Sequence, residues 1–307
     1  MWRKNARLSL APIVRVSVNL NGSLLTAVDD AGSVILQPMD GTARWECSLA
    51  NVESTAIMAD MLLFTLKGES QCFFWKKQSG DDTVHEVLLP RDAAMNATLE
   101  LAAAEVGGSI AVVSNSEERN VIYVYTASDW NLTNQFFGHS GRIVQAFFAG
   151  DFLFSAGADC TVRLWSLLRH AERASYTHAC AIVAAAPGPL ATLFLADEQS
   201  RLYHLHVENI ASAAHARFVA EALELSLTIP TTARVREVTY ASDLLAMSTA
   251  DGSVCLVDLR QGGTVSRLSD YKCLSLAFAA EGDEVHVVTG HSTGEVVLHL
   301  VRFAEPM

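Results

Sequence analysis

The sequence predicts an all-β fold, a seven-bladed β-propeller with four antiparallel strands in each blade. Seven pairs of segments rich in β-branched and aromatic residues are each joined by a short polar turn, which is the pattern of a β-hairpin. The turns are centred near residues 31, 68, 117, 159, 198, 251 and 293. The hairpins therefore recur about every 44 residues, the length of a four-stranded propeller blade.

Each predicted blade starts with an apolar inner segment, such as IVRVSV or RIVQAFF, and ends with a more polar outer strand. The expected single domain, 1–307, divides into blades near 12–49, 52–90, 97–137, 138–177, 178–229, 233–269, and 271–303 together with 1–10. Too few residues follow the last hairpin to form its outer strand. We therefore expect the N-terminal segment WRKNARLSL to supply that strand and to close the ring of blades.

Two segments have a local composition that favours helix instead. Residues 92–106 and 210–225 are rich in Ala, Glu and Leu. The first must nevertheless contain a strand if its blade is complete. The second falls in the longest interval between turns, so a short helix or a loop insertion is expected there.

Composition and charge narrow the class of protein. Half of the 307 residues are hydrophobic, and the formal net charge is −12. A strongly acidic chain is poorly suited to non-specific binding of nucleic acid or of anionic lipid. No run of apolar residues is long enough for a transmembrane helix, so no membrane association is expected.

Cysteine usage and the N-terminus bear on localisation. Six cysteines are dispersed without the spacing of a zinc site, which favours reduced thiols in an intracellular compartment, the cytoplasm or the nucleus. Arg3, Lys4 and Arg7, with no acidic residue near them, resemble a mitochondrial presequence. A basic edge strand is the alternative explanation, and it is the one we favour.

One stretch, GHSGRIVQAFFAGDFLFSAGADCTVRLWS (138–166), resembles a WD repeat. The resemblance implies that four residues form a hydrogen-bonded tetrad that ties the entry loop to the central hairpin: His139, Ser155, Asp159 and Trp165. A buried aspartate needs donors, and the other three side chains can supply them. Residues of about 234–268 match the repeat less fully, with Val257 at the position of the tryptophan, and the remaining repeats are degenerate.

The same resemblance implies a face that binds partners. It places Arg142 and Val144 on that face in the fourth blade, with Arg234 and Arg236 in the sixth and Arg15 in the first. Such arginines could bind an acidic or phosphorylated peptide. Ordinary solvated arginines are the alternative.

Three patterns resemble catalytic or metal sites. Residues 290–294, GHSTG, fit the nucleophile-elbow pattern G-x-S-x-G, which requires a helix after the serine. The following residues alternate like a strand, so a hairpin turn is expected at Ser292. His139, Ser155 and Asp159 have the composition of a catalytic triad, for which we prefer the structural explanation. His204 and His206 share one face of a strand, but no third metal ligand is evident.

We therefore predict a non-catalytic scaffold without cofactor or metal, a stable subunit of a larger protein assembly. A charged fraction of only 18% suggests an apolar outer surface that other subunits cover. One alternative is a subunit of a ribonucleoprotein that contacts RNA through Arg142, Arg234 and Arg236. The other is a serine hydrolase that uses Ser292.

Overall fold

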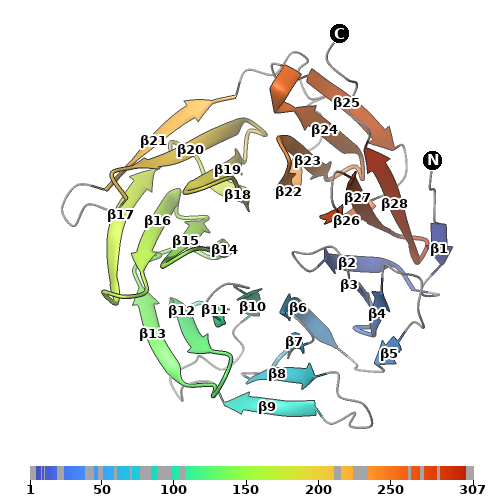
Figure 1. The fold of residues 1–307 in the computed structure, drawn as a ribbon, viewed down its shortest axis with the longest axis horizontal. Helices are drawn as coiled ribbons and strands as arrows, with labels where there is room; N and C mark the ends of the chain where they lie inside the picture. Colours follow the sequence, from blue (N-terminus) through green and yellow to red (C-terminus); the bar gives the residue numbers. More distant parts are fainter. Residues whose placement is uncertain are drawn as a thin grey trace. The chain divides into compact units, whose positions relative to one another are not determined.

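The chain is all-β, as predicted, in the computed structural model of this protein. The structure describes residues 5–7, 9, 11–18, 24–38, 45–47, 51–58, 61–69, 71–76, 84–88, 98–103, 108–210, 216–223, 234–261, 264–269, 273–281 and 284–301. These residues form 28 strands and one short 3₁₀ helix, η1 (Leu259–Gln261). The strands make seven antiparallel sheets of four strands each (Figure 1). Each of the seven predicted hairpins is the central strand pair of one sheet.

The chain divides into two compact units, and the larger continuous one is Val52–Leu223. It contains four sheets, which follow the chain in order. Sheet 2 is β6 (Val52–Met58), β7 (Met61–Leu66), β8 (Gln71–Lys76) and β9 (Val84–Leu88). Sheet 3 is β10 (Thr98–Ala103), β11 (Ser109–Asn115), β12 (Asn120–Thr126) and β13 (Leu132–Phe137). Sheet 4 is β14 (Ile143–Ala149), β15 (Phe152–Gly157), β16 (Thr161–Ser166) and β17 (Ala171–Thr177). Sheet 5 is β18 (Ile182–Pro187), β19 (Thr192–Asp197), β20 (Leu202–Glu208) and β21 (Arg217–Ala222).

The other unit combines Met1–Asn51 with Glu224–Met307 and contains three sheets. Sheet 1 is β2 (Ile13–Val18), β3 (Leu24–Asp29), β4 (Val34–Pro38) and β5 (Trp45–Cys47). Sheet 6 is β22 (Val235–Ala241), β23 (Leu244–Thr249), β24 (Val254–Asp258) and β25 (Thr264–Ser269). Sheet 7 is β26 (Cys273–Glu281), β27 (Glu284–His291), β28 (Glu295–Val301) and, from the N-terminus, β1 (Asn5–Arg7).

The N-terminal strand therefore completes the last sheet, which confirms this part of the prediction. β1 pairs antiparallel with β28, and Asn5 lies opposite Val297 while Arg7 lies opposite Glu295. The first and last segments of the chain thus share one sheet.

Six of the seven sheets begin with the same local irregularity. The first residue of the first strand is buried, and a β-bulge follows directly after it. We call these first residues the anchor residues: Ile13, Val52, Ile143, Ile182, Val235 and Cys273. Because a bulge shifts the register by one residue, the anchors provide a common frame in which positions of different sheets can be compared.

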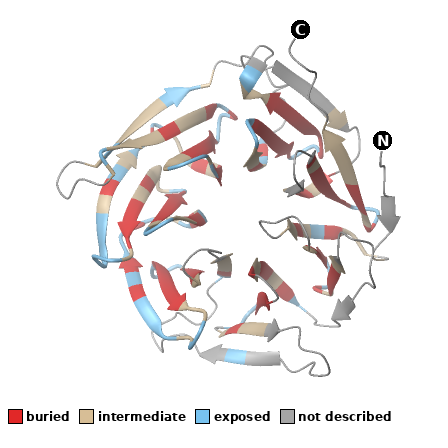
Figure 2. Ribbon diagram, viewed as in Figure 1, coloured by how far each residue is buried: buried red, intermediate tan, exposed pale blue. Residues whose placement is uncertain are grey.

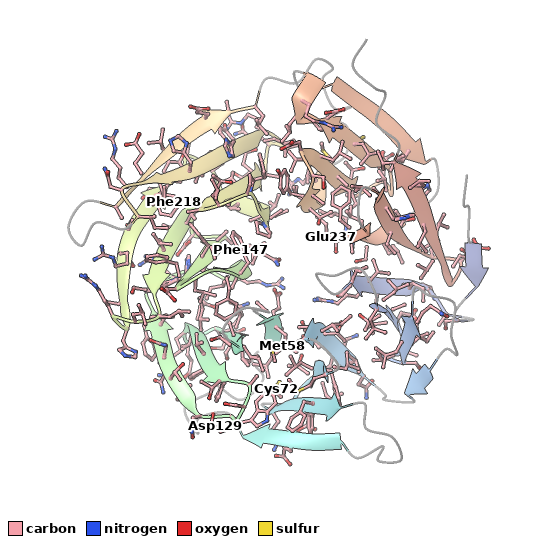
Figure 3. All side chains as sticks on the ribbon, in the orientation of Figure 1. Met58, Cys72, Asp129, Phe147, Phe218 and Glu237 are labelled. Carbon is pink, nitrogen blue, oxygen red and sulfur yellow. The ribbon has the colours of Figure 1, made fainter. Side chains whose placement is uncertain are left out.

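The cores lie between consecutive sheets. In the unit Val52–Leu223, separate clusters of buried residues join sheets 2 and 3, sheets 3 and 4, and sheets 4 and 5. The third includes Phe147 and Phe154, stacked 5.4 Å apart, with the edge of Phe218 against Phe154 (Figure 3). In the other unit, buried clusters join sheets 6 and 7 and sheets 7 and 1. Each buried Leu, Val or Ile contributes roughly 1.5–3 kcal/mol.

In the segment 210–225, where a short helix or a loop insertion was expected, the structure shows that residues 217–222 are not helical. Within that segment, Arg217–Ala222 is strand β21, paired with β20. Phe218 and Ala220 pack on the core between sheets 4 and 5, and this burial outweighs the helical propensity of Ala and Glu. Residues 211–215, 224 and 225 lie outside the described residues. The earlier segment, 92–106, contains strand β10, which the prediction of a complete third blade required.

No helix in the described ranges is long and apolar enough to cross a membrane.

Candidate functional site

The four residues of the predicted tetrad lie in one continuous hydrogen-bonded network in sheet 4. His139 comes from the loop that joins β13 to β14, which we call the entry loop (138–142). Its Nδ1 lies 3.0 and 3.1 Å from the two carboxylate oxygens of Asp159, in the turn between β15 and β16. Its Nε2 lies 2.7 Å from Oγ of Ser155, and Nε1 of Trp165 donates to the same Oγ at 2.8 Å.

The hydrogen-bond partners assign the tautomer of the imidazole. The carboxylate of Asp159 can only accept, so Nδ1 of His139 carries the proton and donates it to Asp159. In the neutral imidazole Nε2 then accepts from the Ser155 hydroxyl, whose oxygen accepts from the indole N–H of Trp165. The network therefore contains a neutral imidazole and an ionised carboxylate.

Burial and hydrogen bonding set the charges in the network. Burial, aided by the charge of Arg163, lowers the pKa of His139, although the charge and hydrogen bond of Asp159 act to raise it. Burial works to raise the pKa of Asp159, but the Thr161 hydroxyl, His139 and the backbone N–H of Ser140 outweigh it, and the pKa is lowered. The Thr161 Oγ1 and Ser140 N–H donors lie 2.8 and 2.9 Å from the carboxylate.

Two glycines make room for the network. At Gly157 a Cβ atom would lie 2.5 Å from Oδ1 of Asp159 and 2.6 Å from Nδ1 of His139. Gly138 has φ +151, and a Cβ atom there would lie 2.5 Å from the guanidinium of Arg163. A side chain at position 157 would therefore press on the network itself, whereas one at position 138 would meet the flexible end of Arg163 and require an unusual backbone conformation.

Ser155 is enclosed within the network. The Ser155 residue is fully buried, and its oxygen is already occupied by Trp165 and His139. A catalytic serine needs an approach for substrate and an oxyanion site beside it. What the four residues do is fasten the entry loop to the β15–β16 hairpin.

A groove of about 750 Å³ opens beside the entry loop. One wall is the β11–β12 turn with Glu117, Glu118 and Arg119, and the other is the entry loop with Arg142. Phe137, 49% exposed, lies at its border. The Arg142 side chain is 62% exposed and pairs with Glu100 at 2.6 Å. The groove thus combines carboxylates, guanidinium groups and an aromatic ring.

Of the other residues of the predicted binding face, Val144 lies in the same unit as Arg142, and Arg15, Arg234 and Arg236 lie in the other unit. Arg142 and Val144 flank the anchor Ile143, and Arg234 and Arg236 flank the anchor Val235 in the same way. Arg142, Arg234 and Arg236 are exposed, and Val144 is half-buried. Arg15 is displaced, because it comes two residues after its anchor, beyond the bulge, and lies opposite Val28.

Glu237, labelled in Figure 3, comes two residues after its anchor in sheet 6, as Arg15 does in sheet 1. Its carboxylate accepts hydrogen bonds from the Leu276 N–H at 2.8 Å and the Ser275 hydroxyl at 3.3 Å. Burial raises the pKa of Glu237, while the Leu276 N–H, Arg15 and Arg236 oppose the rise. A largely buried carboxyl group therefore lies near Arg15 and Arg236 in this unit.

Ser292 lies in the turn between two paired strands, β27 and β28. Its neighbour His291 is buried at the end of β27, Ser292 itself is exposed, and Gly294 has φ +80. A strand, not a helix, follows the turn, so the nucleophile-elbow arrangement is not formed. A Cβ atom at Gly294 would clash with the carbonyl of Ser9, which explains the second glycine of the motif.

His204 and His206 lie on β20 with ring centroids 6.3 Å apart. His204 stacks on Phe194 at 4.8 Å, and burial lowers its pKa. Among the residues that the structure describes, no three His, Cys, Asp or Glu side chains are grouped as a metal site requires.

Sequence reasoning missed two related networks. In sheet 5, His178 Nε2 lies 3.3 Å from Asp197, which also accepts from Arg201 Nε at 2.8 Å. In sheet 1, the Ser9 hydroxyl donates to Asp29 at 2.8 Å. His139, His178 and Ser9 each precede an anchor residue by four positions, and this constant spacing is the signal that could have found them.

The comparisons with known proteins do not assign the chain to a family: no family model matches it, and a search of curated proteins finds no match.

Proposed function

We propose that this chain is a seven-bladed β-propeller of the WD-repeat type and a non-catalytic scaffold that binds other protein subunits in a stable assembly. The main support is the arrangement of the first and last sheets. Sheet 7 takes its outer strand from the N-terminus, and its face packs on sheet 1. A chain whose first and last repeats are neighbours is typical of a closed ring of blades.

Two further observations support the WD-repeat resemblance. The His139 network connects the residues that the resemblance implies, with the direction of donation that a buried aspartate requires. Sheets 1 and 5 fasten the segment before the anchor to the hairpin through Asp29 and Asp197. A scaffold that holds its loops by buried polar contacts presents them to partners in one conformation, which reduces the entropy cost of binding.

The groove beside the entry loop is the partner site that we propose for the unit Val52–Leu223. Arg142 offers an exposed guanidinium that can bind a carboxylate or phosphate with two hydrogen bonds. Glu117 and Glu118 on the opposite wall would repel a densely anionic segment. The groove is therefore better suited to a peptide with one acidic group followed or preceded by a basic residue.

The test is to tag the protein at its native level, purify it gently, and analyse it by size-exclusion chromatography, mass photometry and mass spectrometry. We expect a fixed set of proteins at high mass. Elution of a single particle near 33.2 kDa would contradict the scaffold function.

The same preparation distinguishes the alternatives. RNA crosslinking that is lost when Arg142, Arg234 and Arg236 are all changed to Glu would replace the scaffold proposal by the ribonucleoprotein one. Labelling of Ser292 by a serine-directed covalent probe in the folded protein would replace it by the hydrolase one.

A further inference from the structure

The outer strands of the sheets differ in how their free edges are protected. An edge strand exposes unpaired N–H and C=O groups, and charged side chains normally keep other strands from pairing with it. Among the seven outer strands that the structure describes, six contain charged residues: Arg7, Glu46, Glu86, Glu172 with Arg173, Arg217 with Glu221, and Arg267. β13, with the sequence LTNQFF, contains none.

The adjacent outer strand β17 provides a direct comparison. Both strands have a bulge at the same place, so that Leu132 lies opposite Tyr125 in sheet 3 as Glu172 lies opposite Trp165 in sheet 4. Glu172 pairs with Arg163 at 2.6 Å, and Arg173 follows it. At the matching positions β13 has Leu132 and Thr133. The same backbone arrangement thus carries charged side chains at these positions in sheet 4 and uncharged side chains in sheet 3.

The exposed side chains of β13 gather on one face of the strand. Because of the bulge, Leu132, Gln135 and Phe137 occupy three successive positions on that face, opposite Tyr125, Tyr123 and Val121. All three are exposed, Leu132 by 38% and Phe137 by 49%, and β13 shows pale-blue stretches in Figure 2. Two large apolar side chains therefore face solvent at the two ends of an uncharged edge.

We infer that an extended, uncharged segment of a partner protein adds to β13 as a fifth strand of sheet 3. Backbone hydrogen bonds to the free edge supply affinity, and the side chains supply specificity. Side chains on one face of a strand recur every two residues, so the added strand carries apolar residues four positions apart, over Leu132 and Phe137. The residue between them, opposite Gln135, is polar.

Two observations favour a partner over a second copy of this chain. The net charge of −12 makes two copies repel each other. The strand is also continuous with the proposed partner site, since Phe137 belongs both to β13 and to the border of the groove. The inference rests on the proposed function and specifies how the partner is held.

The test uses the full chain and a phage-displayed library of random linear dodecapeptides. Leu132→Glu/Thr133→Arg gives β13 the charge pair of β17. The matched control, Ser175→Lys, puts a charge on the exposed position of β17 that corresponds to Gln135. Equal thermal midpoints for the three proteins establish that both variants fold.

We expect selected peptides to contain two apolar residues four apart with no charge between them. Their affinity, measured by fluorescence polarisation, falls about tenfold or more in Leu132→Glu/Thr133→Arg, because strand addition would bury those charges unpaired, and is unchanged in Ser175→Lys. Backbone amides of 132–137 gain protection from hydrogen exchange when the peptide binds.

Three results would overturn the inference: no selected peptide, equal affinity for the wild type and Leu132→Glu/Thr133→Arg, or no amide protection in 132–137. Self-association that this variant abolishes would also overturn it and assign the edge to a second copy. Native partners that co-purify equally with the variant would remove the inference and leave the proposed function intact. If no protein co-purified with the wild type, the proposed function itself would be contradicted.

Discussion

Sheets 4 and 5 fasten the same segment of their repeat in two different ways. His139 and His178 each precede a buried isoleucine by four residues and contact an aspartate of the next hairpin. The aspartate differs in position. Asp159 lies in the turn, two residues after Gly157, whereas Asp197 occupies the strand-end position of Gly157 itself.

The partners of the two aspartates differ accordingly. In sheet 4 the network continues inward, from His139 to Ser155 and Trp165. In sheet 5 the corresponding positions are the fully buried Leu195 and Leu205, and Asp197 instead pairs outward with Arg201. Hydrogen bonds into the core in sheet 4 and an ion pair toward the surface in sheet 5 thus both accompany the contact that fastens the segment before the anchor to the next hairpin. Only the first is visible as a sequence motif.

Removal of the sheet 5 carboxylate is expected to have the largest effect. Asp197 is fully buried and accepts from His178, from Arg201 and from two backbone N–H groups. Asp197→Ala should lower the free energy of unfolding, measured by urea denaturation, by about 3 kcal/mol, because polar donors lose their acceptor. A loss as small as that of a surface substitution would show that sheet 5 does not depend on this network.

Gly157→Ala should produce the next largest effect. The added Cβ atom would press on both Asp159 and His139, and overpacking of this kind costs about 1–3 kcal/mol. The chemical shifts of the His139 ring should also change, because its distance to Asp159 increases. Unchanged stability and unchanged ring shifts would contradict the tight packing of the sheet 4 network.

A double-mutant cycle between Ser155 and Trp165 converts sheet 4 toward the apolar arrangement of sheet 5. Ser155→Ala and Trp165→Phe should each cost about 1–2 kcal/mol, because each leaves a buried partner without its hydrogen bond. The double variant should cost less than the sum, by roughly 1 kcal/mol. Strict additivity in urea denaturation would show that the indole and the hydroxyl are not coupled.

The stability of the protein should fall in two steps as the pH is lowered from neutrality. The folded pKa of His139 is lowered, so below about pH 6.5 the unfolded chain takes up a proton that the folded chain does not, and stability falls. The folded pKa values of Asp159 and Asp197 are lowered too, so their contribution is present above about pH 4 and is lost as the pH falls further.

His139→Gln tests the first step. The slope of stability between pH 7 and pH 5 should decrease but not vanish, because burial also lowers the pKa of His291. Thermal midpoints across this range measure it, and an unchanged slope would mean that His139 does not titrate as the buried network requires.

Arg142→Ala should have the smallest effect on stability. Sheet 5 has Ala181 at the matching position, and the Arg142–Glu100 pair is exposed, so the cost should stay below about 1 kcal/mol. Partner binding at the groove should weaken in the same variant. A large loss of stability would mean that this arginine belongs to the structural network rather than to the surface.

Periodicity and local composition determined much of this protein. They predicted the seven hairpins and the N-terminal strand of sheet 7, because strand patterns are local properties of the chain. The four residues His139, Ser155, Asp159 and Trp165 were implied instead by the resemblance of residues 138–166 to a WD repeat. The turn at Ser292 followed from the strand pattern after it.

Tertiary structure decided the remainder. β21 forms because Phe218 and Ala220 pack against the core between sheets 4 and 5. The Ala- and Glu-rich sequence around them does not indicate this contact. Arg15 lies apart from Arg142, Arg234 and Arg236 because it comes two residues after its anchor, beyond the bulge, whereas the other three arginines adjoin their anchors. Asp29 and Asp197 acquire Ser9 and His178 as partners, and the four-residue spacing before an anchor that relates these partners becomes visible only once the bulges of the folded sheets define the anchors.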